Sequence, residues 1–244
     1  MGGFFHEFFT RPLFNALVFL YQTAAVEDLG IAIILLTLTI RLILYPLFYK
    51  SYKNQTLLQK IQPEIKKIQH DHKNNRERQA QEMLALYKQH KVNPFSSFFL
   101  LLVQLPILIA LYRVFLRGFN GEALTDLYSF VAAPSDFNNS LLGLINLAEP
   151  HIIIVGLAAA AQYFQGKLSL AKTPRNQGAS GAERITRQMV FIGPALTLVI
   201  LYSLPSAVGL YWLTTSIFSL VQQIFINRSL KKNGTITDPN QKTT

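Results

Sequence analysis

The chain has 244 residues, of which 50% are hydrophobic and only 15% are charged, and it contains no cysteine. This balance is unusual for a soluble domain and typical of a protein that crosses the membrane several times. Without cysteine, the sequence excludes disulfides, thiolate metal sites and a lipidated N-terminal cysteine. A net charge of +10 is also typical of a protein that binds nucleic acid. The distribution of the charges along the chain therefore has to decide between a nucleic acid and a membrane as the partner.

Residues 1–28 are expected to form an interfacial amphipathic helix on the outside of the membrane. Pro12 suits the first turn of a short helix. The apolar side of that helix contains Phe14, Leu17, Val18 and Tyr21. The segment resembles a cleaved signal peptide only superficially, because acidic Glu7 precedes Arg11 and no small-residue cleavage site follows. We therefore expect the helix to remain on the mature protein.

Hydropathy predicts five membrane spans, and with them an all-α integral membrane protein. Each is close to the roughly 20 residues that cross a hydrocarbon core of about 30 Å. The third and fourth are marginal in length, which local thinning of the bilayer can accommodate. The spans are Leu29–Phe48, Phe95–Leu116, Ile152–Leu170, Met189–Leu204 and Ala207–Ile226.

The charges of the connecting segments predict one orientation. Residues 49–92 carry ten Lys or Arg against four acids, and the loop at 171–188 and the tail at 227–244 are also basic. Residues 118–151 have no Lys or Arg and four acids. By the positive-inside rule, the N-terminus and the 117–151 loop lie outside and the C-terminus lies in the cytoplasm. This pattern accounts for most of the net charge, so we expect no specific nucleic-acid partner.

The basic segment 49–94 is predicted to be a cytoplasmic helical hairpin. Apolar residues recur at helical spacing on both sides of a break at Asn74-Asn75. They are Leu57, Leu58, Ile61, Ile65 and Ile68 before the break, and Met83, Leu84, Leu86 and Tyr87 after it. An ordinary solvated basic loop would not explain these apolar stripes.

Polar residues recur on one face of several spans. Thr37, Arg41 and Tyr45 are spaced i, i+4, i+8 in the first span. The fifth span carries a similar stripe, and the second and third spans each contribute glutamine. These residues are Trp212, Ser216, Ser219 and Gln223, with Gln104 in the second span and Gln162 in the third. Since polar groups are costly in lipid, the stripes are expected to converge, either as hydrogen bonds between helices or around a hydrated cavity.

The charge of Arg41 favours a hydrated cavity over direct hydrogen bonds between helices. Its guanidinium stays charged, and the predicted spans contain no Asp or Glu to neutralise it. A dry, unpaired cation would carry a large desolvation penalty, which water access removes. In the predicted orientation Arg41 lies on the cytoplasmic side of the midplane, so the cavity is expected to open inward.

The chain resembles the YidC family of membrane-protein insertases over nearly its whole length. The opening FTRPLFNALVFLY is similar to the interfacial helix of that family, and GIAIILLTLTIRLILYPLFYKS to its first core span. The segments LQKIQPEIKKIQ and QEMLALYKQHKVNP resemble the two arms of the family's cytoplasmic hairpin. LLVQLPILIALY resembles the family's second span, and PSAVGLYWLTTSIFSLVQQIFINR resembles its final span. One departure lies at Phe95–Phe99, where the family has a Gly-Gly-Cys turn, so any role of that turn is not carried over.

The resemblance implies an insertase with a hydrophilic groove, closed to the outside and open to the cytoplasm and the lipid. Arg41 stands at the position of the groove arginine, and Thr37 and Trp212 match positions along the client path. The implied partners are nascent membrane-protein clients and the lipid bilayer, in a bacterial inner membrane. Contact of the basic tail with ribosomes and cooperation with the Sec translocon are left open. The chain resembles the short five-span form, without a large external domain.

Two other functions compete with this one. An intramembrane enzyme is not expected, because the spans lack paired Asp, a Ser/His pair and an HExxH helix, and no cofactor motif occurs. A small anion channel or transporter that uses Arg41 is the alternative, although proton or cation coupling would need a carboxylate inside the membrane.

Overall fold

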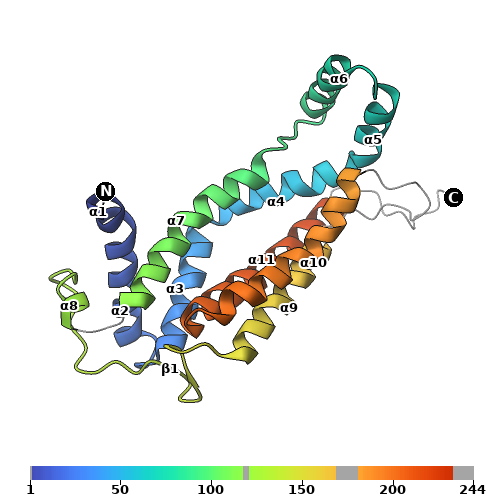
Figure 1. The fold of residues 1–244 in the computed structure, drawn as a ribbon. Coiled ribbons are helices and arrows are strands. Elements are labelled where there is room, and N and C mark those ends of the chain that lie inside the picture. The colour runs from blue at the N-terminus through green and yellow to red at the C-terminus, as the bar shows by residue number, and fades with distance from the viewer. Residues whose placement is uncertain (1, 118–120, 169–180, 233–244) are drawn as a thin grey trace.

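The computed structural model describes residues 2–117, 121–168 and 181–232, and these are mainly helical. Helices α4 and α7 run side by side, and α9, α10 and α11 form a second group (Figure 1). The helix α3 connects the two groups by packing on α11 and joining α4. The α5–α6 pair lies at one extreme of the molecule, and the chain's N-terminal helices lie at the other (Figure 1).

The N-terminal segment consists of α1 (Gly2–Phe5), the π-helix η1 (His6–Thr10) and α2 (Arg11–Thr23). Pro12 lies in the first turn of α2, where its missing N–H costs nothing. The predicted apolar side of this helix is buried, at Phe14, Leu17, Val18 and Tyr21. It packs against α3 and α7. The segment is therefore part of the protein core, and its apolar side faces the protein and not a membrane surface.

The predicted first span is not one straight helix. It consists of α3 (Leu29–Ile43) and α4 (Tyr45–Lys60), which meet at Leu44 with a bend of 69°. The reason is Pro46, which lacks an N–H and would clash with the preceding turn of a continued helix but fits the first turn of a new one. The expected stack of three polar residues is wrong for this reason. Tyr45 lies beyond the bend and is 39% exposed, while Thr37 and Arg41 are 1% and 5% exposed.

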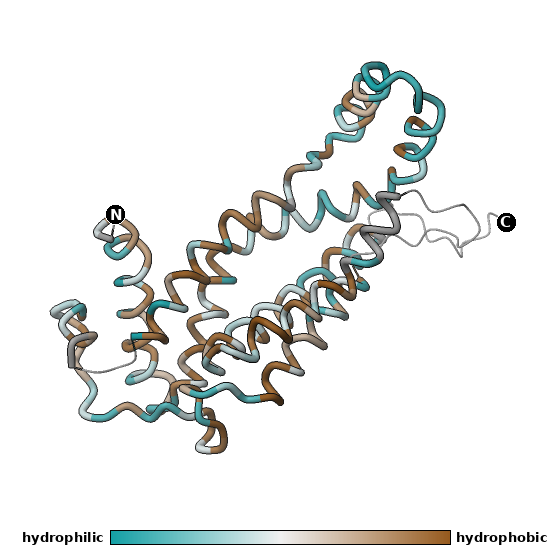
Figure 2. Tube along the Cα trace, in the orientation of Figure 1, coloured by the Kyte–Doolittle hydropathy of each residue, from teal (hydrophilic) through white to brown (hydrophobic). Residues whose placement is uncertain are grey.

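Two amphipathic helices follow, α5 (Gln62–Asp71) and α6 (Arg76–Gln89). They share a small apolar core formed by Ile61, Ile65, Leu86 and Val92. The imidazole of His72 lies 2.8 Å from the Glu82 carboxylate and ties the two helices together near their turn. Their surfaces are largely hydrophilic, in contrast to the hydrophobic α7 and α9 (Figure 2).

The remaining long helices are α7 (Ser96–Arg117), α9 (Ile152–Leu168), α10 (Gly181–Tyr202) and α11 (Ser206–Lys232). Among the described residues, Phe98–Arg117 and Ser206–Leu230 are long and apolar enough to cross a membrane, and α3 with α4 becomes a third if the bent pair is one span. Ile152–Leu168 and Val190–Tyr202 are apolar but shorter, so the count of five stays a prediction. The helix α10 begins before Met189 and α11 continues beyond Ile226, so parts of the predicted loop 171–188 and tail 227–244 are helical. Residues 169–180 and 233–244 of these segments lie outside the described residues.

Large apolar side chains are exposed along α7 and α10. They include Phe98, Phe99, Leu101 and Leu102 on α7, and Phe191, Leu196, Val199 and Tyr202 on α10. An apolar surface of this extent is not tolerated in water and is suited to lipid. The chain is therefore a mainly helical membrane protein.

The predicted external loop is folded. It contains the short helix α8 (Gly121–Leu124) and two short antiparallel strands, β1 (Ser140–Leu141) and β2 (Ile145–Asn146), so the chain is not purely helical. The strand β1 packs against α3, and the largest apolar cluster of the chain joins this segment to α2, α3, α7 and α11. We call this part of the molecule, made of η1, α2, the end of α7, α8, the two strands and the start of α3, the capped end.

Candidate functional site

Most of the predicted site residues lie on two helices that pack together. Thr37 and Arg41 are on α3, and the predicted stripe of α11 contributes Ser216, Ser219 and Gln223. These five side chains are all nearly inaccessible, with exposures from 0% for Gln223 to 5% for Arg41. The helix α11 contacts both α3 and α9, so its buried polar stripe lies within the bundle.

Arg41 is the central residue of this polar interior. Its guanidinium carbon lies 4.2 Å from the centre of the Phe48 ring, across the bend between α3 and α4. The hydroxyl of Tyr52, one turn beyond Phe48 along α4, interacts with the guanidinium. Among the ion pairs of the described residues, none includes Arg41. Its charge is thus met by ring faces and hydroxyls and not by a carboxylate.

A polar residue near Arg41 that the sequence patterns did not single out is Tyr211. The hydroxyl of Tyr211, which is 3% exposed, is close enough to interact electrostatically with the guanidinium. Gln104 of α7 donates a hydrogen bond to that hydroxyl. Gln165 of α9 donates one to the Tyr52 hydroxyl over 3.4 Å. We call the buried polar residues of α3, α4 and α11 the polar core, and Gln104 of α7 and Gln165 of α9 bind its tyrosine hydroxyls. The polar core consists of Thr37, Arg41, Tyr52, Tyr211, Ser216, Ser219, Gln222 and Gln223.

The polar core retains hydrogen-bonding capacity that its own residues do not use. Nη1 of Arg41 and Oε1 of Gln222 are buried, and neither has a hydrogen-bond partner among the described residues. The Gln222 side chain makes one long contact of 3.4 Å, from its Nε2 to the carbonyl of Tyr45. A buried polar atom without a partner costs roughly 1–3 kcal/mol, and more when it is charged. Such atoms suit a site that receives an external polar group.

Two predicted site residues lie elsewhere. Gln162 on α9 accepts a hydrogen bond from the Thr197 hydroxyl on α10, so it joins those two helices. Trp212 packs against an apolar cluster that contains Val155, Ala158 and Leu201. No described contact connects either of these residues with Arg41, so the expected single polar face is divided between the polar core and helix-to-helix packing.

Metal binding has no candidate among the described residues, because no group of three or more His, Cys, Asp or Glu side chains gathers there.

Comparison with known proteins identifies the family. Residues 19–233 match the model of the family described as 60Kd inner membrane protein. The chain belongs to this family. The match includes α3, α4, α7, α9, α10 and α11, and therefore every residue of the polar core.

Curated relatives of the family carry the name membrane protein insertase YidC. The protein of Clostridium tetani is 35% identical over 86% of this chain and 86% of its own length. That of Fusobacterium nucleatum is 33% identical over 86% of this chain and 92% of its length. A longer relative from Wolinella succinogenes is 31% identical over 96% of this chain but only 40% of its own length. These relatives confirm the predicted family: its description names an inner membrane protein, and its curated members are named as insertases.

Proposed function

We propose that this chain is a membrane-protein insertase that moves short hydrophilic segments of client proteins across the bilayer and releases client helices into lipid. The observation that carries the proposal is the buried Arg41, which has no carboxylate partner among the described residues and whose Nη1 has no hydrogen-bond partner there. In a chain of an insertase family, such a site suits an acidic or polar client segment in transit.

The proposed orientation has five spans, with the capped end outside and the α5–α6 pair in the cytoplasm. The charge distribution supports it, since residues 49–92 carry ten basic residues and residues 118–151 carry none. The extensive packing of the capped end suits a seal on the outer side. Arg41 near the end of α3 then lies on the cytoplasmic side of the midplane, where a groove open to the cytoplasm and lipid would reach it.

The energetic argument starts from the cost of moving a hydrophilic segment through hydrocarbon. Its backbone groups and charges lose their water, at several kcal/mol for each unsatisfied polar group. A hydrated site at half depth shortens the dry distance. A fixed cation 4 Å from a client carboxylate attracts it by about 4 kcal/mol at an effective dielectric constant of 20. The client's apolar helix then moves sideways into lipid, and its burial drives the step without a nucleotide.

The polar core residues have distinct proposed roles. Arg41 attracts the acidic segment, and Thr37, Ser216, Ser219 and Gln223 line its path. Gln104 acts through Tyr211, whose hydroxyl it holds. Gln162 and Trp212 keep α9 in place against α10 and α11. The basic tail and the α5–α6 pair are the proposed surfaces for receiving clients from the cytoplasm, and contacts with ribosomes and with the Sec translocon belong to the same proposal.

Purified chain in liposomes, supplied with a single-span client, tests the proposal. A photo-crosslinking side chain at Ser216, which leaves Arg41 in place, should capture the client during insertion. The same probe at Phe225, which is 60% exposed on α11, is the matched control and should capture less. Equal capture at both positions, or insertion that proceeds equally without the chain, contradicts the proposal. Chloride flux measured in the same liposomes should stay at the level of empty vesicles, and flux above it would favour an anion channel.

A further inference from the structure

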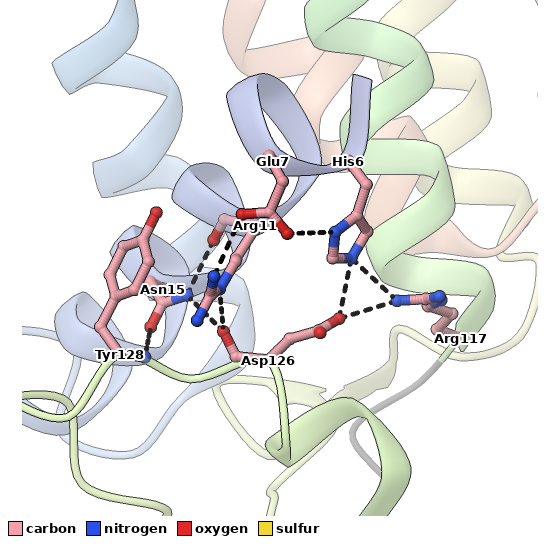
Figure 3. A network of polar contacts seen from close by, with 7 residues as sticks. All are labelled: His6, Glu7, Arg11, Asn15, Arg117, Asp126 and Tyr128. Atoms are coloured by element: carbon pink, nitrogen blue, oxygen red, sulfur yellow. Dashed lines mark hydrogen bonds and ion pairs between the residues drawn. The ribbon is translucent and has the colours of Figure 1, made fainter. Parts of the chain in front are cut away.

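The capped end contains a second polar site, remote in sequence from the polar core. A cavity of about 560 Å³ opens between η1 and the last turns of α7. Its walls include His6, Thr10, Arg113, Leu116, Arg117 and Asp126. In Figure 3 the side chains of His6 and Arg117 both point toward Asp126. The cavity therefore combines several charged groups with an apolar edge.

The charges of this cavity do not balance. The Asp126 Oδ2 atom lies 2.9 Å from Arg117 Nη1 and 2.9 Å from His6 Nε2, so the single carboxylate is shared. Arg113 stacks on the Phe5 ring at 4.9 Å and takes part in none of the ion pairs described. Two arginines, Arg113 and Arg117, therefore share the wall with one carboxylate, Asp126, and the wall keeps a positive charge that this carboxylate does not neutralise. A negatively charged ligand would neutralise this positive charge.

A buried hydroxyl adds an independent indication of a ligand. Thr10 is 3% exposed and lines the cavity, and its Oγ1 has no hydrogen-bond partner among the described residues. Thr10 is the last residue of η1, and His6 is the first. Single turns of π-helix are frequently found at functional sites. Thr10 and His6 thus line the same cavity as the two arginines.

The position of the cavity along α7 indicates where the ligand comes from. Arg117 is the last residue of the candidate membrane span Phe98–Arg117, which places the cavity at the level of a membrane surface. Arg113 lies one turn earlier on the same face. Leu116 lies in the cavity wall and is 56% exposed, and Phe4 and Phe8 of the neighbouring α1 and η1 are 70% and 65% exposed. A ligand with an anionic head and an apolar tail fits this combination better than a soluble anion does.

We propose that this cavity binds the phosphate group of a membrane phospholipid, between η1 and the end of α7. Arg113 and Arg117 contact the phosphate oxygens, and the Thr10 hydroxyl donates a further hydrogen bond. Leu116 contacts an acyl chain. The site is separate from the polar core, so this proposal does not depend on the insertase mechanism.

Native mass spectrometry of the full chain in a neutral detergent measures the binding directly, with short-chain phosphatidylglycerol as the probe. Arg113→Gln should weaken phosphatidylglycerol binding about tenfold, the loss expected for one hydrogen-bonded charge. Thr10→Val should weaken it about threefold, the effect of one neutral hydrogen bond. Arg78→Gln removes the same charge from the exposed surface of α6 and should leave binding unchanged. Arg113→Lys keeps the charge and should retain most of the affinity.

Three outcomes would overturn the proposal. The first is equal binding to Arg113→Gln and to the unchanged protein, with equal thermal unfolding midpoints showing that both are folded. The second is equal binding of a diacylglycerol of the same chain length, which lacks the phosphate. The third is displacement of the lipid by inorganic phosphate at the same concentration, which would make the cavity a site for the free ion.

Discussion

Each end of α3 buries a charged side chain, but the two side chains differ in their hydrogen-bond partners. At its first turn Asp28 is 7% exposed, and both carboxylate oxygens are used. Oδ1 accepts from the backbone N–H of Ile31 at 2.9 Å, and Oδ2 accepts from that of Leu142 at 2.5 Å. Near its last turn Arg41 is 5% exposed, and its Nη1 has no partner among the described residues.

This difference separates structural polar groups from groups that are available to a ligand. Asp28 caps the helix and binds the β1–β2 segment to it, so both of its carboxylate oxygens stabilise the fold. Arg41 adds little to the fold relative to the cost of burying it, because no carboxylate of the described residues offsets the desolvation. Four substitutions can break or sharpen the comparison, from the largest expected effect to the smallest.

Gly30→Leu tests the close packing of the capped end. A Cβ atom at position 30 would lie 2.9 Å from the Cα of Leu141 and closer still to its side chain, and the backbone of β1 cannot yield cheaply. We expect a loss of about 3 kcal/mol in the free energy of unfolding, at the upper end for overpacking. Thermal unfolding in detergent measures it. Gly156→Ala on α9 is the control, because nothing lies within 4 Å of its Cβ, and it should leave stability equal or higher.

Asp28→Ala removes the cap and the contact with Leu142. We expect a loss of about 2 kcal/mol, the upper range for N-cap removal with a second hydrogen bond lost. Asp28→Asn keeps the capping oxygen and should lose less. If Asp28→Ala is as stable as the unchanged protein in the same unfolding measurement, the capped end is not held by this carboxylate.

Gln222→Met tests the polar core. The substitution removes the unpartnered Oε1 and one long hydrogen bond while keeping the side-chain shape. We expect stability to be unchanged or higher by up to about 1 kcal/mol, because a buried unsatisfied polar group is replaced by an apolar one. Client insertion should become slower. A loss of stability comparable to that of Asp28→Ala would show that the polar core is a structural network.

Glu7→Gln tests the edge of the capped end and should have the smallest effect. The hydrogen bond from Arg11, at 3.1 Å, lowers the pKa of the Glu7 carboxyl from its usual 4.5. A carboxyl whose pKa is lowered on folding contributes stability above its unfolded pKa and loses it as the pH falls through the folded value. The unfolding midpoint should therefore fall slightly less below pH 4.5 in the variant than in the unchanged protein. Identical acid profiles would contradict a role for this ion pair.

Much of the helical organisation could be predicted from the sequence, because its signals are local. The periodic apolar residues of α2 predicted its buried side, although the side chains face protein and not lipid. The bend at Leu44 was missed, although Pro46 was the available signal, because hydropathy averages over such a break.

The rest depends on contacts that are distant in sequence. The strands β1 and β2 have two residues each, too short for an alternating pattern, and only their packing on α3 gives them structure. Arg41, Thr37 and the α11 stripe could be predicted, since polar residues are conspicuous within apolar runs. Tyr52 and Tyr211 could not, because a tyrosine in such a run is equally common in packing and at an interface. Gln162 and Trp212 followed the same pattern as the polar core, and only the neighbouring helices α10 and α9 decide where they lie.

The most direct test of the central proposal is the coupling between the charge at Arg41 and the charge of the client. Insertion rates into liposomes are measured for the unchanged chain and for Arg41→Gln, each with a client whose translocated tail carries either Asp or Asn. We expect Arg41→Gln to slow the Asp-tailed client about tenfold more than the Asn-tailed client, which corresponds to a coupling of about 1.4 kcal/mol. Arg78→Gln, with the same change in net charge, should slow neither. If Arg41→Gln slows both clients by the same factor, Arg41 does not act by attracting acidic client segments.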